Sequence, residues 1–162
     1  QIDWEVELGV VIGTPVRRAS PQQADAAIAG YTVINDVSMR DWQRRTAQWL
    51  QGKAFEASTP VGPTLVTGDT LNNAADLELR CEVDGHVMQR SRTSDLLFTP
   101  ADIVAYISQI TTLLPGDLIA TGTPGGVGAA RDPQTFLQPH QVLRTTIEGI
   151  GECLNTCVAE KP

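Results

Sequence analysis

Two glutamates, Glu5 and Glu7, stand one residue apart in an apolar segment near the start of the chain. The run of valines, leucine and isoleucine that follows, closed by a glycine, predicts a strand. Because successive side chains of a strand point to opposite faces, the two carboxylates share one face. Burying two like charges together is costly unless a cation lies between them, and hard divalent ions favour such oxygen ligands. An exposed strand face with two solvated glutamates is the simpler alternative.

A third carboxylate, Asp36, favours the cation site. It follows the β-prone stretch Tyr31–Ile34, where the chain turns polar at Asn35. Three carboxylates on one ion leave coordination positions open for water or substrate oxygens, as Mg²⁺ and Mn²⁺ usually require. A 2-oxo acid supplies two such oxygens, and chelation stabilises an enolate that develops at its 2-oxo position. The sequence therefore predicts a divalent-metal site suited to enolate chemistry.

Four sequence blocks occur in a fixed order along the chain: Glu5-Val6-Glu7, Gly30 to Gln43, Gly52 to Phe55, and Gly122 to Gly128. In this order they resemble the fumarylacetoacetate hydrolase (FAH) family, in particular its C-terminal catalytic domain in the bacterial acylpyruvase and 2-hydroxyhepta-2,4-diene-1,7-dioate isomerase branch. Each block alone is weak, but the ordered set is specific, and the resemblance covers essentially the whole chain.

The resemblance implies roles for further side chains. Lys53 matches the active-site lysine of the family, and Gln43 matches a glutamine that contacts substrate. Thr123 is expected to contact the substrate carboxylate from a glycine-rich loop that includes Gly122, and the N–H groups of such a loop can cradle an anion. Arg40 has two interpretations of equal weight. It binds substrate, or it holds Asp36 or Asp41 in a structural ion pair.

The implied function is a divalent-metal-dependent hydrolase that cleaves the C–C bond of acylpyruvate-type 2,4-dioxo acids through a metal-bound pyruvate enolate. Mg²⁺ or Mn²⁺ is the expected cofactor, with Ca²⁺ as a substitute in crystals, and the partner is a small anionic 2-oxo acid. An oxaloacetate-type decarboxylase or tautomerase, or a 2-hydroxy-dienoate isomerase, is the alternative that uses the same site. A non-catalytic scaffold or ligand-binding relative is the alternative from another class, although retention of three carboxylates and Lys53 argues against it. The sequence does not identify the acyl group.

The resemblance also concerns the ends of the chain and its assembly. Family members carry a longer N-terminal portion, with a histidine and a glutamate on a short lid helix that activate water. The sequence starts at Gln1, so we expect residues 1–162 to form one catalytic domain that lacks this lid and, on its own, is a poor catalyst. The resemblance further implies a homodimer.

Composition bounds the class of protein. The hydrophobic share of 41% and the charged share of 19% are typical of a folded globular domain. A net charge of −7 argues against a nucleic-acid groove, and no apolar run approaches the length of a membrane span. The odd set of three cysteines has no zinc-site spacing, and the two histidines, His86 and His140, are expected in surface turns. We expect a cytoplasmic protein.

The elements that must position the site are mostly strands. Predicted helices cover Pro21–Ile28 after the N-cap Ser20, Pro100–Ile110 after the N-cap Thr99, and Arg40–Leu50. Predicted strands are Leu65–Thr67, Leu77–Val83, Val87–Ser91, Leu118–Thr121 and Val142–Glu148, with a hairpin turn at Asp84-Gly85. The pattern predicts a strand-rich α+β fold, and the resemblance implies a mixed β-roll, a distorted barrel of sheets with short helices.

Overall fold

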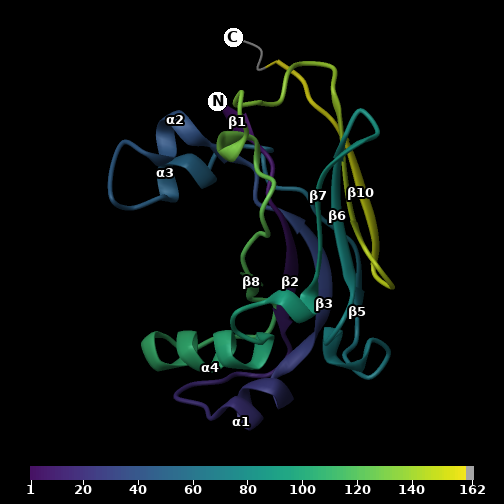
Figure 1. The fold of residues 1–162 in the computed structure, drawn as a ribbon. Helices are drawn as coiled ribbons and strands as arrows, with labels where there is room; N and C mark the ends of the chain where they lie inside the picture. The colour runs from purple at the N-terminus through teal and green to yellow at the C-terminus, as the bar shows by residue number, and fades with distance from the viewer. Residues whose placement is uncertain (160–162) are drawn as a thin grey trace.

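Two four-stranded antiparallel sheets form most of the molecule in the computed structural model, which describes residues 1–159 (Figure 1). The first sheet has the order β5-β3-β2-β8. Its strands are β2 (Val6–Ile12), β3 (Ile28–Asn35), β5 (Val61–Val66) and β8 (Leu118–Ala120). The edge strand β8 is short and pairs with β2 only from Gly9 to Val11. The start of β2, which carries Glu7, therefore extends beyond the end of β8.

The second sheet has the order β10-β9-β6-β7. Its strands are β6 (Glu78–Val83), β7 (His86–Arg92), β9 (Val142–Ile147) and β10 (Gly151–Thr156). The predicted hairpin at Asp84-Gly85 joins β6 to β7, and both turn residues have positive φ. A separate two-stranded pair, β1 (Ile2–Asp3) with β4 (Ser38–Met39), holds the start of the chain beside the segment after β3.

The hydrophobic core lies between the two sheets. Val6, Leu8 and Val10 of β2 are buried, and they meet the buried Leu79 and Leu143 from the second sheet. This alternation along β2 points Glu7 away from the core face. The side of the first sheet that carries the carboxylates is thus the one not covered by the second sheet.

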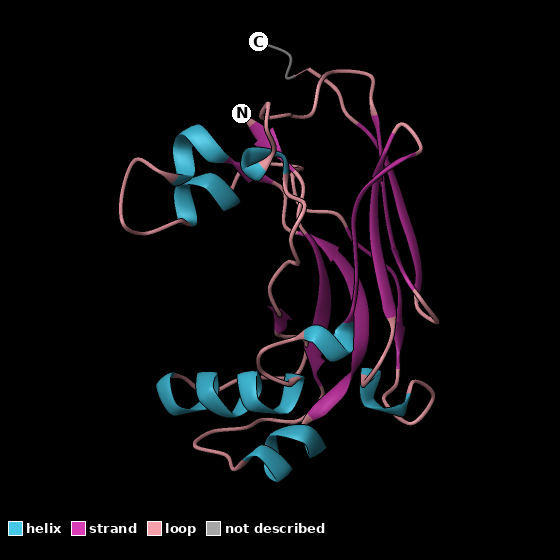
Figure 2. Cartoon of the chain, in the orientation of Figure 1, coloured by secondary structure: helices cyan, strands magenta, loops and turns pink. Residues whose placement is uncertain are grey.

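Short helices gather at the two ends of the sheets, as Figure 2 shows. At one end α1 (Pro21–Ala26) packs on α4 (Pro100–Ile110), and at the other lie α2 (Arg40–Gln43) and α3 (Leu50–Lys53). Single 3₁₀ turns occur at Asn72–Ala74, Thr93–Asp95 and Gly128–Ala130. Ser20 and Thr99 each form the capping box expected of an N-cap. None of the helices within residues 1–159 has the length and apolar character needed to cross a membrane.

The predicted helix over Arg40–Leu50 is wrong, because two short helices, α2 and α3, replace it. Gly52 packs so closely on Gln43 that a Cβ at position 52 would lie 2.5 Å from the Cβ of Gln43. This contact requires the chain to fold back between the helices. In the connection, the Thr46 hydroxyl donates to the carbonyl of Gln48 and accepts from its N–H, which competes with helical hydrogen bonding.

Other differences are smaller. Strand β10 was not predicted, because it lies at a sheet edge and most of its side chains are exposed, so its hydrophobic pattern is weak. The predicted strand at Leu65–Thr67 begins earlier, at Val61, and the first helix ends at Ala26, so Ile28 belongs to β3. Ile110 at the end of α4 is 69% exposed and does not share the helix's buried face. The strand-rich α+β fold is confirmed, with open sheets in place of a closed barrel.

Candidate metal centre

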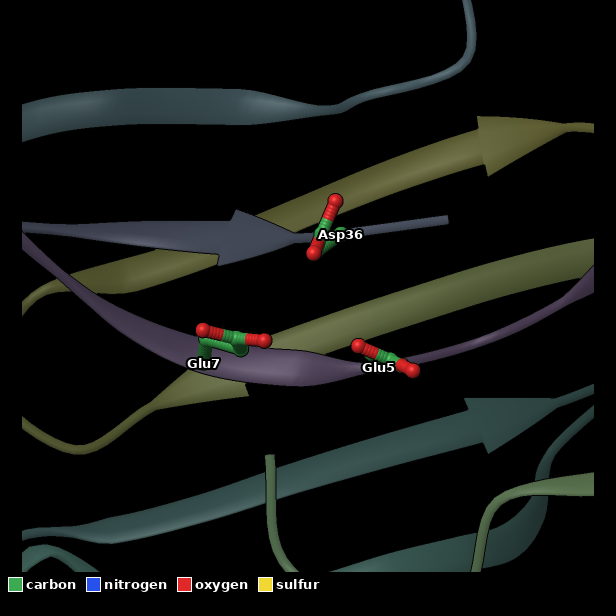
Figure 3. Close-up of side chains that lie close together, drawn as sticks. All are labelled: Glu5, Glu7 and Asp36. Carbon is green, nitrogen blue, oxygen red and sulfur yellow. The ribbon is translucent and has the colours of Figure 1, made fainter. Parts of the chain in front are cut away.

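Glu5, Glu7 and Asp36 lie together at the end of the first sheet. One carboxylate oxygen from each residue lies within 4.8 Å of the others. Glu7 belongs to β2, Glu5 directly precedes that strand, and Asp36 directly follows the neighbouring strand β3 (Figure 3). Register explains the proximity, because Val6 pairs with Asn35 and the N–H of Asp36 donates to the carbonyl of Glu5 at 2.9 Å. The antiparallel pairing of two strands therefore gathers residues 29 or more positions apart in sequence.

Three buried side chains hold the backbone on which Glu5 sits. The N–H groups of Trp4, Glu5 and Val6 donate to Asp3 Oδ1, Asn35 Oδ1 and Gln89 Oε1, at 2.8, 2.8 and 3.0 Å. Asn35 and Gln89 are fixed in turn by the second sheet, since Asn35 donates to Thr145 Oγ1 of β9 and Gln89 belongs to β7. Buried polar groups are stable when satisfied in this way. The position of Glu5 therefore depends on both sheets.

Two cationic side chains neutralise part of the acidic cluster. The Lys53 ammonium lies 2.7 Å from Glu5 Oε2 and 2.6 Å from Asp36 Oδ2. The Arg40 guanidinium contacts the other oxygen of Glu5 at 2.6 Å and Asp3 Oδ2 at 2.9 Å. Burial lowers the pKa of Arg40, but its hydrogen bonds and ion pairs with Asp3 and Glu5 outweigh burial and raise that pKa above its ordinary value.

Glu7 has no cationic partner within ion-pair distance among residues 1–159. Its carboxylate accepts a hydrogen bond from the N–H of Gly122 at 2.6 Å. Burial raises the pKa of Glu7 to about 7, and the negative charges of Asp36 and Glu5 add to this effect, while the Gly122 N–H and Lys53 oppose it. Glu7 is thus a buried carboxylate whose ionised form is only partly compensated.

The arrangement fits a divalent cation. Asp3, Glu5, Glu7 and Asp36 are four carboxylates set against the two cationic side chains of Arg40 and Lys53. The excess of negative charge is greatest at Glu7, because Asp36 pairs with Lys53, and an added cation between them would stabilise the ionised form of Glu7. Oxygen donors of this kind suit Mg²⁺ and Mn²⁺. Glu5, Glu7 and Asp36 are the residues that could hold such an ion.

The glycine-rich loop closes one side of the site. Gly122, whose φ is +102°, directs its N–H at Glu7. The Thr123 hydroxyl donates to the carbonyl of Val6 at 3.0 Å and accepts from Gln89 Nε2 at 2.8 Å. The loop thus contacts the ligand strand itself. A substrate contact of Gly122 or Thr123 stays a prediction.

The structure brings all the sequence-predicted site residues to this end of the first sheet. Lys53 is the last residue of α3, and Gln43 Oε1 accepts from Arg40 Nη1 at 3.0 Å. The structural interpretation of Arg40 fits the geometry, but its expected partners were wrong. Arg40 pairs with Asp3 and Glu5 in place of Asp36 or Asp41, because β1 places Asp3 beside the N-terminal end of α2.

Sequence reasoning missed three buried residues that support the site: Asp3, Asn35 and Gln89. Asp3 was detectable in part, because Asp3, Glu5 and Glu7 alternate along the chain. Its oxygens accept from the N–H groups of Gly128 and Ala129 at 2.6 and 2.9 Å, and so fix the far end of the glycine-rich loop. His86 and His140 are exposed, as expected.

A pocket of about 240 Å³ shares the glycine-rich loop with the site. Its walls include Leu8, Leu79 and the loop residues Gly122 to Pro124. Leu8 points to the opposite face of β2 from Glu7, and none of Glu5, Glu7 and Asp36 lines this space. The charge distribution and not the cavity therefore identifies the site.

A family model for the C-terminal domain of fumarylacetoacetate (FAA) hydrolase matches residues 1–158. The mitochondrial oxaloacetate tautomerase Fahd2a of Rattus norvegicus is 43% identical over 159 residues, which are 98% of this chain and 51% of the relative. The chain thus spans about half the length of this curated relative.

Solved structures agree with the family match. The 5-carboxymethyl-2-hydroxymuconate delta-isomerase from Mycobacterium smegmatis superposes with a TM-score of 0.89 at 41% identity, over 99% of this chain and 60% of that protein. The fumarylpyruvate hydrolase from Pseudomonas aeruginosa, solved in complex with Mn²⁺ and pyruvate, gives 0.88 at 32% identity, over 98% of this chain and 66% of that protein. The chain belongs to the fumarylacetoacetate hydrolase family and contains its C-terminal domain.

Proposed function

We propose that the chain carries the metal-dependent active site of an enzyme that cleaves the C–C bond of acylpyruvate-type 2,4-dioxo acids by hydrolysis. One observation carries the proposal: three carboxylates converge within 4.8 Å, and the Lys53 ammonium contacts two of them. Such a set combines a cation site with a nearby proton donor. Reactions that pass through an enolate need both.

Glu5, Glu7 and Asp36 would hold the ion. A bound Mg²⁺ or Mn²⁺ supplies Lewis-acid stabilisation of negative charge on the carboxylate and carbonyl oxygens of a 2-oxo acid. The fumarylpyruvate hydrolase relative, solved with Mn²⁺ and pyruvate, supports both the ion and the substrate class. Asp36 and Lys53 are only partly buried, so the cluster is open to solvent on their side.

Lys53 would act on the reacting atoms. Its ammonium lies between Glu5 and Asp36, and it can donate a hydrogen bond to the developing enolate oxygen or a proton to the enolate carbon. Gln43 is buried beside Arg40 and accepts its hydrogen bond through Oε1. The Gln43 amide nitrogen remains as a donor, and we assign it to a substrate oxygen.

Tautomerisation or decarboxylation of oxaloacetate is the second candidate function. The 43% identity to an oxaloacetate tautomerase favours it, and the delta-isomerase relative extends the same chemistry to isomerisation. These reactions require an enolate and a proton carrier, and Lys53 can supply the proton. Hydrolysis requires in addition a group that activates water.

Assay of the protein at its natural length on acylpyruvates, fumarylpyruvate and oxaloacetate, with and without Mn²⁺, tests the proposal. We expect pyruvate release from the acylpyruvates that depends on Mn²⁺ and is lost in Lys53→Met. The matched control is Arg90→Met, which removes a cation from the exposed face of the second sheet. Turnover of oxaloacetate alone would favour the second candidate. Mn²⁺ binding without turnover of any of these substrates would favour a non-catalytic relative.

We also propose that the protein works as a homodimer. The proposal rests on the family resemblance of the sequence, which covers residues 1–158. Light scattering that gives a monomeric mass at micromolar concentration would contradict it.

A further inference from the structure

A closed ring of hydrogen bonds joins three segments that are distant in sequence. The Val6 N–H donates to Gln89 Oε1 at 3.0 Å, and Gln89 Nε2 donates to Thr123 Oγ1 at 2.8 Å. The Thr123 hydroxyl completes the ring by donating to the carbonyl of Val6 at 3.0 Å. Gln89 Nε2 also donates to the carbonyl of Pro124 at 2.9 Å. The ring therefore links β2, β7 and the glycine-rich loop.

The ring supplies the hydrogen bonds that strand β8 does not provide to Val6. Because β8 pairs with β2 only from Gly9 to Val11, regular sheet pairing on that side of β2 stops before Val6. The Thr121 N–H still reaches the carbonyl of Leu8, at 3.2 Å. At Val6 the side chains of Gln89 and Thr123 satisfy both backbone groups. A buried backbone group left without a partner is costly, so these two side chains have a structural reason to be there.

The peptide that the ring holds is the one between two proposed ligands. Val6 lies between Glu5 and Glu7, so a shift of its backbone moves both carboxylates. The same ring fixes Thr123, whose neighbour Gly122 donates to Glu7 at 2.6 Å. Both the backbone of Glu7 and the hydrogen bond to its carboxylate thus depend on the amide of Gln89, which is 1% exposed.

We infer that Gln89 is a positioning residue of the metal centre: from the second sheet it fixes the Val6 peptide between Glu5 and Glu7 and couples it to the loop that holds Glu7. Among residues 1–159, Gln89 has no hydrogen bond with a ligand side chain and acts through Val6 and Thr123. The single proton of the Thr123 hydroxyl goes to Val6, so Thr123 takes part in the same positioning. This inference rests on the proposed metal site.

The test compares Gln89→Met, which keeps a similar length but loses both polar ends, with a matched control. Thr93→Val removes a buried hydroxyl that also satisfies two backbone groups, the N–H of Leu77 and the carbonyl of Ala74, at the end of β7. Both variants lose stability, but Thr93 has no hydrogen bond to the ligand strand or its loop. Thr123→Val is the second test variant, because it opens the ring from the loop and does not remove the Gln89 side chain.

Amide hydrogen exchange without metal is the first readout. We expect exchange at Val6 and Gly122 to accelerate about tenfold or more in Gln89→Met, relative to Thr93→Val. Thr123→Val should accelerate the same two amides. Unchanged exchange at Val6 and Gly122 in both test variants would overturn the inference, because the ring would then not hold the segment.

Mn²⁺ affinity by calorimetric titration is the second readout. Residues that orient metal ligands from outside the coordination shell typically contribute about 10–100-fold to affinity, and we expect a loss in this range for Gln89→Met. Thr93→Val should stay within about twofold of the wild type. In the double variant Gln89→Met/Thr123→Val the losses should not multiply, because both changes open one ring.

Two results separate the inference from the proposed function. Wild-type protein that does not bind Mn²⁺ would contradict the proposed metal site, while the exchange data would still decide whether Gln89 positions Val6. Wild-type Mn²⁺ affinity in a folded Gln89→Met variant with accelerated exchange would overturn the inference alone, because the metal centre would then not depend on the ring.

Discussion

Two clusters of acidic and basic side chains within residues 1–159 differ in burial. The buried cluster of Asp3, Glu5, Glu7, Asp36, Arg40 and Lys53 lies at the end of the first sheet. The exposed cluster of Asp76, Glu78, Arg90, Arg92 and Glu148 lies on the second sheet. Both contain more acids than bases. Glu7 is 3% exposed, whereas the side chains of Asp76 and Glu148 are 58% and 57% exposed.

The pKa of one carboxylate in each cluster is shifted, and the two shifts have opposite signs. Burial raises the pKa of Glu7 to about 7, whereas the hydrogen bond from Arg92 lowers the pKa of Asp76. Water solvates the excess charge of the exposed cluster, so no further cation is needed there. Glu7, in contrast, is shielded from water, and no cationic side chain among residues 1–159 lies within ion-pair distance of it. Burial of unpaired charge, and not the number of acidic residues, marks the metal site.

Removal of a ligand from the buried cluster should have the largest effect. Asp36→Ala is expected to weaken Mn²⁺ binding by more than about 100-fold, because it removes one of three carboxylates, a larger change than the loss of an outer partner. Calorimetric titration measures this affinity. The matched change in the exposed cluster, Asp76→Asn, should leave it unaltered. Equal Mn²⁺ affinity of Asp36→Ala and the wild type would contradict the assigned site.

Neutralising the buried carboxylate should stabilise the metal-free protein. Ionising Glu7 in the fold is unfavourable, because its pKa rises from 4.5 to about 7, which corresponds to about 3 kcal/mol. Glu7→Gln keeps the shape and can still accept from Gly122, so the free energy of unfolding above pH 7 should increase by up to that amount. Urea unfolding without metal measures it. At saturating Mn²⁺ the wild type should be more stable than Glu7→Gln, because only the wild type keeps all three carboxylate ligands. A Glu7→Gln variant less stable than the metal-free wild type would contradict the predicted excess of buried charge.

The pH dependence of the metal-free protein follows from the same group. Because the pKa of Glu7 is higher in the folded than in the unfolded chain, the folded protein binds an extra proton between pH 4.5 and about 7. The free energy of unfolding should therefore increase through Glu7 as the pH falls from about 7 to 4.5, because protonation removes the unfavourable buried charge. Mn²⁺ affinity should fall over the same range, by up to about tenfold per pH unit, since one proton must leave. Both quantities, the free energy of unfolding without metal and the Mn²⁺ affinity, are measured against pH in the wild type and in Glu7→Gln, and the difference between the two proteins isolates the contribution of Glu7. A difference that does not change with pH would be inconsistent with the raised pKa of Glu7.

The smallest effect is expected at an exposed ion pair. Arg90 lies 2.6 Å from Glu78, and its side chain is 67% exposed. Arg90→Met should change the free energy of unfolding by less than about 1 kcal/mol and leave Mn²⁺ affinity intact. Chemical denaturation measures the first quantity. A loss of several kcal/mol would mean that the exposed cluster is not simply a solvated surface.

The carboxylates of the site could be predicted from the sequence because their spacing is local. Glu5 and Glu7 lie one residue apart on a strand, and Asp36 follows the next strand, so antiparallel pairing brings them together. Lys53 and Gln43 were identified through the family motif, and the geometry places Lys53 between two of the carboxylates.

The supporting residues could not be predicted in the same way. The role of Gln89 depends on where β8 ends and on how the second sheet packs on the first, and neither feature is visible in local sequence. The break between α2 and α3 depends likewise on the contact of Gly52 with Gln43. The ion-pair partner of Arg40 was missed because β1 and β4 pair through only two residues each.

A crystal grown with Mn²⁺ and measured by anomalous scattering tests the central claim most directly. We predict one strong peak bounded by Glu5, Glu7 and Asp36, with carboxylate oxygens at about 2.0–2.6 Å from the ion. Lys53 should be displaced from at least one of its two present carboxylate partners, because the cation competes for the same oxygens. The assignment would be contradicted if a crystal grown at saturating Mn²⁺ showed anomalous peaks only at exposed carboxylates, such as Asp76 or Glu148, and none at the buried cluster.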